Sequence, residues 1–175
     1  FNSKTIKMKL IKNNIIKVLF GILIFATVSS CDEVADTNPG GTTTKDFAGD
    51  WFISLKDSDG KDVGGGDFYL HHTYNTAAND NTMWIDDEKH GYWIKCKMTI
   101  NLADGTFSAT NADNANDPGT KVTITEGKIE KGAGLSKAGH KVDKITFTAH
   151  FSYDPAGYNI IHTGHKRTGF LEDEY

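Results

Sequence analysis

The sequence predicts an all-β protein, in which about eight or nine antiparallel strands form either a closed barrel or a sandwich. Three observations support this prediction. After residue 46, apolar and polar residues alternate with a period of two in one segment after another. Short turn signals rich in Gly, Pro, Asn and Asp separate these segments. No convincing helical stretch of ten residues appears among them.

The clearest predicted strand is "YWIKCKMTINL", residues 92–102. Its apolar face consists of Tyr92, Ile94, Cys96, Met98, Ile100 and Leu102. The opposite face carries Trp93 and the polar residues Lys95, Lys97, Thr99 and Asn101. Apolar residues at every second position indicate a strand with one face on a core, because a helix would scatter the same residues around its circumference. Cys96 is therefore expected to be a small, buried and unreactive residue.

Seven further segments repeat this alternation in chain order. Their apolar faces are Trp51, Ile53 and Leu55; Phe68, Leu70, His72 and Tyr74; Met83 and Ile85; Phe107 and Ala109; Val122 and Ile124; Ile145, Phe147, Ala149 and Phe151; and Tyr158, Ile160 and His162. The connecting turns are expected at residues 57–60, 79–81, 103–105, 117–119 and 154–157.

The N-terminal part has the features of an exported protein. Five lysines and no acidic residue precede the apolar run at 18–28, which is too short to span a bilayer. Residues 1–30 are therefore predicted to be a signal peptide, with Met8 as the expected start. "VSSC" at 28–31 resembles the lipobox of bacterial lipoproteins, which implies that Cys31 carries diacylglycerol. The alternative is an ordinary signal peptide with a chance cysteine.

Residues 31–46 are expected to be the lipidated cysteine and a flexible tether, followed by a domain at 47–175. Asp32, Glu33 and Asp36 resemble the acidic export signal of surface lipoproteins in Bacteroidetes, although a solvated linker has the same composition. The expected location is the cell envelope, with a lipid anchor in the outer membrane and possible surface exposure. A lipid-bearing Cys31 would leave Cys96 without a disulfide partner.

Charge excludes one class of partner. Without residues 1–30 the chain keeps 14 basic and 23 acidic residues, a net charge of −9. Proteins that neutralise phosphates are usually basic, so no nucleic-acid partner is expected. The same balance disfavours binding to anionic headgroups, which leaves the covalent lipid as the only expected link to a membrane.

A family resemblance narrows the fold. "AGDW" at 48–51 is similar to the G-x-W signature of lipocalins, in which the Trp closes one end of the barrel and an Arg near the end of the last strand packs over its ring. Gly49, Trp51 and Arg167 are the matching residues. Together with "VSSC", "AGDWFISLKDSDG" and "YNIIHTGHKRTGFLEDE", they resemble a family of small Bacteroidetes lipoproteins catalogued as lipid-binding putative hydrolases. The resemblance implies an antiparallel, lipocalin-like (calycin-type) up-and-down β-barrel of about eight strands.

The function expected from this resemblance is a lipid-anchored extracytoplasmic binding protein that holds a small apolar or amphipathic, lipid-like ligand in its barrel. The expected inward face supplies the candidate lining residues, which are Phe68, His72, Tyr74, Met83, Tyr92, Met98, Phe107, Phe147, Tyr158 and His162. The same residues would equally fill a closed core. His72 and His162 are expected to project into the lumen, as hydrogen-bonded histidines or as polar anchors.

Two other functions remain open. A surface accessory protein would bind a glycan or a protein partner through Trp84 and Trp93, which are expected on the outer face, where they otherwise pack as a cross-strand pair. A hydrolase is the other alternative, but the sequence contains no G-x-S-x-G nucleophile motif and no catalytic residue is predicted. No metal or cofactor is expected, and the acidic stretch at 111–119 is read as a solvated loop rather than a calcium site.

Overall fold

The computed structural model describes residues 40–175. The predicted signal peptide, the lipobox, Cys31 and most of the expected tether lie outside the described residues. Residues 41–175 form one compact unit that contains every strand and the whole hydrophobic core. This segment therefore has what an independently folding domain needs. No helix among residues 40–175 is long and apolar enough to cross a bilayer.

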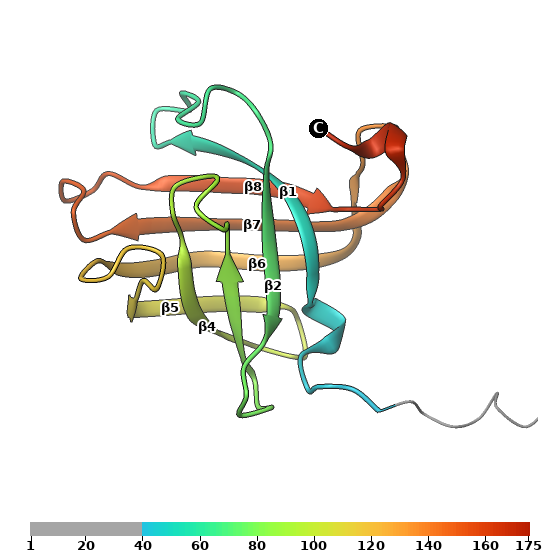
Figure 1. Ribbon diagram of the computed structural model, residues 1–175, viewed down its shortest axis with the longest axis horizontal. Coiled ribbons are helices and arrows are strands. Elements are labelled where there is room, and N and C mark those ends of the chain that lie inside the picture. Colours follow the sequence, from blue (N-terminus) through green and yellow to red (C-terminus); the bar gives the residue numbers. More distant parts are fainter. Residues whose placement is uncertain (1–39) are drawn as a thin grey trace, which may run out of the picture. The chain divides into compact units, whose positions relative to one another are not determined.

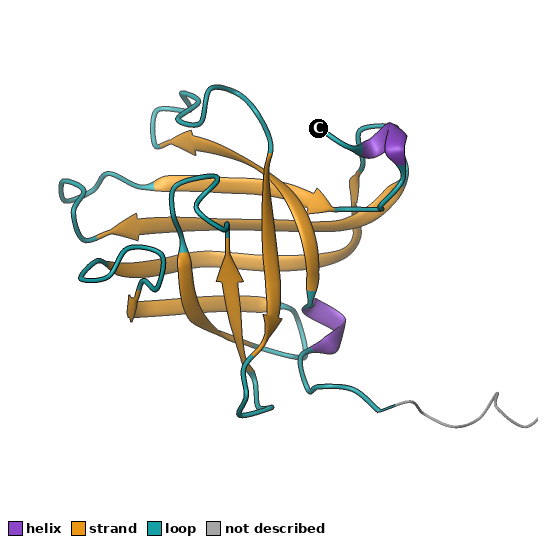
Figure 2. Ribbon diagram, in the orientation of Figure 1, coloured by secondary structure: helices purple, strands orange, loops and turns teal. Residues whose placement is uncertain are grey.

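Eight strands form a closed antiparallel barrel with up-and-down connectivity (Figures 1 and 2). Each strand pairs with the next along the chain, and the last pairs with the first, which decides between the barrel and the sandwich. The strands are β1 (Gly49–Asp57), β2 (Tyr69–Asn75), β3 (Thr82–Asp86), β4 (Lys95–Ile100), β5 (Thr106–Asp113), β6 (Lys121–Leu135), β7 (Lys141–Phe151) and β8 (Ile160–Lys166). Two short 3-10 helices, η1 (Lys45–Phe47) and η2 (Leu171–Asp173), complete the described elements and confirm the all-β prediction.

The barrel is flattened into two crossing layers. In Figure 1, β2 and β4 run steeply across β6, β7 and β8, which lie behind them. Side chains from both layers meet in one apolar core, and most of its residues come from the predicted inward faces. Seven of the eight expected faces point inward as predicted, and the exception is the segment that forms β2.

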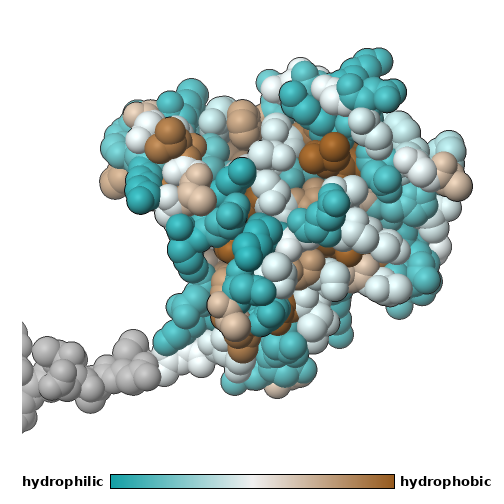
Figure 3. All heavy atoms as spheres, turned by 180° about the vertical axis from the view of Figure 1, so that it is seen from behind, coloured by the Kyte–Doolittle hydropathy of each residue, from teal (hydrophilic) through white to brown (hydrophobic). Residues whose placement is uncertain are grey.

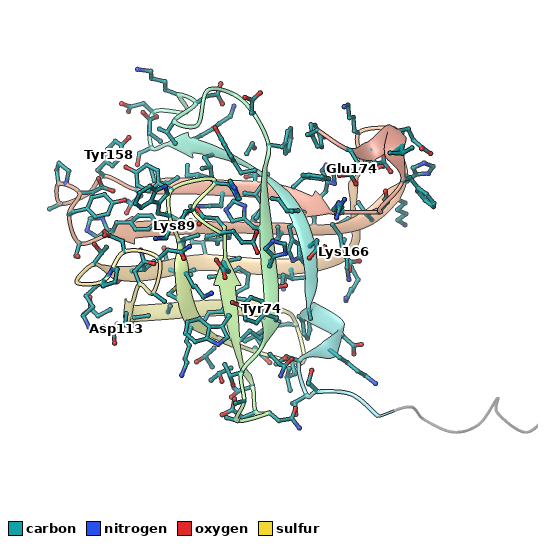
Figure 4. The ribbon with its side chains drawn as sticks, in the orientation of Figure 1. Tyr74, Lys89, Asp113, Tyr158, Lys166 and Glu174 are labelled. Carbon is teal, nitrogen blue, oxygen red and sulfur yellow. The ribbon has the colours of Figure 1, made fainter. Side chains whose placement is uncertain are left out.

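The two ends of the barrel differ in their connections. At the loop end are the connections 58–68, 87–94, 114–120 and 152–159. Four of the five predicted turns fall wholly between strands, and the turn at 57–60 begins at the last residue of β1. At the closed end are η1 and the connections 76–81, 101–105 and 136–140. Figure 4 shows Tyr158 beside the loop-end terminus of β8 and Lys166 at its other terminus.

The domain begins earlier than the expected boundary at residue 47. Thr44 is fully buried, and Thr43 forms two hydrogen bonds with Asn79: its backbone N–H donates to Oδ1 at 2.9 Å and its hydroxyl to the carbonyl oxygen at 2.8 Å. Residues 41–46 are thus part of the folded unit rather than of the tether. The sequence did not indicate this earlier start of the domain, because threonines that pack at the end of a barrel have the same polar composition as a linker.

Candidate functional site

Two histidines lie inside the apolar core. His71 on β2 and His162 on β8 are both fully buried. Strand register places them there: His71 is opposite Trp51 of β1, and His162 is opposite Leu55 of β1 and Phe147 of β7. The two imidazole rings meet edge to face, with centroids 5.9 Å apart. His162 also stacks on the ring of Phe147, with centroids 4.1 Å apart and an interplanar angle of 13°.

The backbone fixes the tautomer of both rings. Nδ1 of His71 lies 3.0 Å from the carbonyl oxygen of Tyr69, and Nδ1 of His162 lies 3.1 Å from that of Ile160. A carbonyl oxygen only accepts, so each Nδ1 carries the hydrogen and donates it. Each Nε2 of a neutral ring is then an acceptor, and neither Nε2 has a hydrogen-bond partner. Orphaned buried polar atoms are rare in folded proteins and call for an explanation.

Burial keeps these rings neutral. Loss of hydration lowers the pKa of His71 below 6.5, although the nearby carboxylate of Asp87 favours the protonated ring. Burial, reinforced by the neighbouring His71, holds the pKa of His162 well below 6.5. The lumen therefore contains two uncharged acceptors near neutral pH.

The connection between β3 and β4 covers this part of the core. Asp87 is fully buried and accepts backbone N–H groups from Lys89 at 2.9 Å and Gly91 at 3.2 Å, together with the side-chain amide of Asn116 at 3.1 Å. Gly91 lies so close to the core that an added Cβ would be 3.4 Å from Cε1 of His71 and 3.3 Å from a methyl group of Leu55. The segment 87–94 thus closes the barrel above His71.

The inward face expected for β2 is wrong. His72, Phe68 and Tyr74 lie outside the lumen, and the inward residues are Tyr69, His71 and Thr73. His72 binds a carboxylate oxygen of Asp50 at 2.8 Å. The hydroxyl of Tyr74 donates to Asp86 at 2.9 Å, and Figure 4 shows Tyr74 on the near face of the barrel.

An outer apolar cluster explains the error. Phe68 stacks on the ring of Tyr175 at 4.4 Å, and Phe52 meets the same ring edge-on at 4.9 Å. His165 contacts all three rings. The C-terminal segment therefore buries apolar residues on the outside of the barrel, so apolar character did not mark the inner face of β2.

The remaining lining candidates divide into two groups. Met83, Met98, Phe107, Phe147 and His162 are buried together in the core. Tyr92 and Tyr158 are partly buried and pack against the core from the loop end. Tyr92 lies outside β4, next to the ring of Phe151, and its hydroxyl donates to Asp154 at 3.3 Å. Burial raises the pKa of Tyr92 to about 12.

The closed end is built around Trp51, although not with the expected cation. The indole is fully buried, and its Nε1–H donates to the hydroxyl of Thr73 at 2.8 Å. Lys166, not Arg167, places its ammonium over the ring, 5.8 Å from the centroid. Arg167 follows directly after the last residue of β8 and faces outward, where it binds Glu174 at 2.8 Å and lies over Phe52. Gly49 approaches Lys166, whose Cε would be 2.8 Å from an added Cβ.

The outward tryptophans do not form the expected cross-strand pair. Trp84 is opposite Lys97, whose ammonium lies 5.3 Å from the Trp84 ring. Trp93 lies in the 87–94 connection, has a positive φ of 58° and is 51% exposed. With Gly91, Tyr92, Asp117 and Tyr153 it lines a hollow of about 370 Å³ at the loop end.

Among the described residues, no histidine ring is hydrogen-bonded to a serine or cysteine side chain. Cys96 is buried in the core, which raises the pKa of its thiol to about 12. Residues 40–175 also contain no cluster of three histidine, cysteine or carboxylate side chains that would hold a metal ion.

Sequence reasoning missed the polar residues that close the loop end. Asp87, Asn114 and Asn116 are buried and hydrogen-bond the backbone of the 87–94 connection. Tyr92 continues the parity of β4 and so concealed this connection within a predicted strand. The signal that would have revealed it is "DDEKHG" at 86–91, a polar run that ends in glycine.

The fold and the interior place this protein in one structural class. It is a closed eight-stranded antiparallel barrel whose apolar core contains a few polar groups. The chain belongs to the family described as "lipid-binding putative hydrolase", whose model matches residues 36–171. The match spans the whole barrel, from before η1 to the start of η2. A comparison with curated proteins found no match.

Proposed function

We propose that this protein is a lipid-anchored extracytoplasmic binding protein that holds a small amphipathic, lipid-like ligand in the lumen of its barrel. Membership of a lipid-binding family and the closed barrel both fit a ligand-binding protein. The observation that carries the proposal is the pair of buried imidazoles, because their two unpartnered Nε2 atoms lie in a mostly apolar interior. Ligand pockets typically combine apolar walls with a few polar groups that orient the ligand.

Binding in the lumen requires a local opening. The core residues around His162, including Ile145 and Phe147, are at most 2% exposed, so an apolar chain has to displace side chains or a covering loop. The connection 58–68 is the better candidate for this movement, since it contains three consecutive glycines at 64–66. The 87–94 connection is held instead by the buried carboxylate of Asp87.

Native mass spectrometry tests the proposal. Residues 41–175 would be expressed in a bacterium and purified without detergent, and solvent extraction would follow the mass measurement. We expect an adduct of lipid-like mass at close to one per chain, which extraction removes. A bare mass that persists after incubation with a lipid extract of the expression host would contradict a lumenal binding function.

The anchor and the location form a separate part of the proposal. They rest on the "VSSC" motif and on the basic and apolar residues before it. Changing Cys31→Ala should move the protein from the membrane fraction to the soluble fraction, because the thiol is the point of attachment. Metabolic labelling with an alkyne fatty acid should be lost at the same time. Unchanged membrane fractionation of the variant would refute the anchor.

A second candidate function is binding of a glycan or protein at the loop end. The exposed rings of Trp93 and Tyr153, 51% and 54% exposed, favour it because they border the hollow beside Asp117. Seen from the back, the surface is mostly hydrophilic with separate apolar areas, which offers no broad apolar interface on that face (Figure 3). Loss of binding in Trp93→Ala with an unchanged lumen would identify this second function.

A further inference from the structure

The two buried imidazoles limit the chemistry of whatever meets them. Nδ1 of each ring already donates to its own strand, to the carbonyl of Tyr69 or of Ile160. Nε2 of each ring is therefore the only polar atom left, and it only accepts. A partner for this pair has to donate hydrogen bonds.

Several kinds of group meet that requirement or an equivalent one, among them a metal ion, a charged ammonium group and a neutral hydroxyl. A carboxylic acid also donates when it is protonated, but in water it is mostly ionised near neutral pH. A metal ion usually needs at least three protein ligands or open positions filled by water, and no three-residue cluster exists among residues 40–175. An ammonium group loses most of its hydration in an apolar core, and the buried carboxylate of Asp87 is already hydrogen-bonded to three N–H groups. A hydroxyl is neutral and donates a single hydrogen, which an imidazole Nε2 accepts.

We propose that His71 and His162 bind the hydroxyl end of a neutral lipid-like ligand, and that they select a long-chain alcohol over the ionised fatty acid of the same chain length. This inference rests on the proposed function, because it assigns the polar end of the same lumenal site. Phe147, stacked on His162, and Leu55, opposite it in register, supply the apolar surface next to the hydroxyl.

The hydrogen-bonding requirement of the two Nε2 atoms also disfavours an ionised carboxylate as the ligand group. A carboxylate has acceptors only, so it makes no hydrogen bond with either Nε2. The carboxylate of Asp87 is also buried near His71, where it disfavours a second negative charge. The carboxylate oxygens of Asp87 already accept hydrogen bonds from Lys89, Gly91 and Asn116. The site thus discriminates by hydrogen-bond polarity as well as by charge.

A matched pair of probes tests this selectivity. Binding of 1-decanol and of decanoate to residues 41–175 would be measured by isothermal titration calorimetry at pH 7.5, below the critical micelle concentration of decanoate. The same titrations would use His71→Phe and His162→Phe, which keep an aromatic ring but remove the acceptor. His72→Phe is the control, since His72 lies one residue from His71 on the outer face and binds Asp50.

We expect the affinity for decanol to be at least tenfold higher than that for decanoate. Decanol gains one hydrogen bond, and decanoate would bury an unpaired charge. This ratio should fall to about twofold in whichever of His71→Phe and His162→Phe removes the Nε2 that accepts the single hydroxyl hydrogen, and should be kept in His72→Phe. Because the ratio of decanol to decanoate affinity is compared between wild type and variants, the difference in water solubility between the two probes cancels.

The failures of the two proposals are distinguishable. Equal binding of both probes, tighter binding of decanoate, or a ratio that survives both lumenal variants would overturn the hydroxyl assignment and leave a lumenal lipid site. Binding of neither probe would overturn the proposed function and this inference together.

A second measurement uses only the wild-type protein, so its result does not depend on whether a variant folds. Long-range ¹H–¹⁵N spectra of the histidine rings in the wild-type chain report the state of each Nε2. Decanol should shift the Nε2 resonance of His71 or of His162 upfield, as a lone pair that accepts the single hydroxyl hydrogen does, while both Nδ1 atoms stay protonated. Unchanged Nε2 resonances at saturating decanol would place the hydroxyl elsewhere and refute the assignment.

Discussion

At the scale of single residues, the two buried imidazoles lower the stability of the barrel. Each Nε2 gives up a hydrogen bond from water and gains none from the protein, which costs about 1–3 kcal/mol per atom. Other parts of the core offset this loss, notably the stack of His162 on Phe147. A group that donates a hydrogen bond to one of these Nε2 atoms would recover part of this cost.

Protonation of these rings makes the stability of the protein depend on pH. Burial lowers the pKa of both rings below 6.5 in the folded state, whereas they titrate near 6.5 in the unfolded chain. Below that pH the unfolded state binds more protons, so the free energy of unfolding should fall by up to about 1.4 kcal/mol per pH unit and ring. Above it, the contribution is constant.

Urea unfolding of residues 41–175 at pH 7.5 and pH 5.5 measures this dependence. His162→Phe keeps the stacked ring without the titrating nitrogen, so the loss of stability between the two pH values should be clearly smaller than in wild type. Asp173 does not interfere in this range: burial would raise its pKa, but hydrogen bonds from Ser136, Thr168 and Ala138 hold it at about 2. Identical losses in wild type and His162→Phe would contradict the buried neutral state.

Trp51 should be among the residues that matter most for stability. Its indole is fully buried and hydrogen-bonded to Thr73, so Trp51→Ala should lower the free energy of unfolding by about 3–5 kcal/mol. Trp93→Ala is the matched control, because Trp93 is 51% exposed, and it should cost well under half as much. Thermal unfolding followed by circular dichroism compares the two. Similar melting temperatures for Trp51→Ala and wild type would remove Trp51 from its role at the closed end.

At the scale of elements, alternation predicted the strands well where one face meets the core and the other meets water. It failed where both faces are covered. Phe68, directly before β2, packs against Tyr175 on the outside of the barrel, so apolar residues of this segment are split between two sides and no local pattern separates His71 from His72. Alternation is also interrupted in β6 by an irregularity. Glu126 has a positive φ of 55°, the register shifts there, and Ile129 faces the core although it is an odd number of residues from Ile124.

Close packing of the closed end rests on the turn before β5. Gly105 has a φ of 73°, and an added Cβ would lie 2.4 Å from the carbonyl oxygen of Ile129. Gly105→Ala should therefore combine the cost of a left-handed alanine, about 1 kcal/mol, with about 1–3 kcal/mol of displacement. Gly60→Ala is matched, since Gly60 has a φ of 80° and open space around it. Equal destabilisation of the two variants in urea would show that the closed end tolerates the extra atom.

At the scale of the whole molecule, the closed barrel explains why the fold was predictable and the site was not. Strand number, turns and most inward faces follow from local alternation, and closure follows once β8 pairs with β1. The site depends on contacts distant in sequence: His71 and His162 are 91 positions apart and meet only because β2 and β8 both flank β1. The covering carboxylate of Asp87 comes from a third part of the chain.

The measurement that tests a lumenal ligand site most directly is isoleucine-methyl NMR of residues 41–175 during titration with 1-decanol. Ile53, Ile85 and Ile145 are fully buried in the core, whereas Ile161 on β8 is 39% exposed and faces outward. A lumenal ligand should shift the three core methyl signals with one common saturating curve and leave that of Ile161 almost unchanged. Shifts confined to Ile161 and other outward methyl groups, with an unperturbed core, would contradict the account.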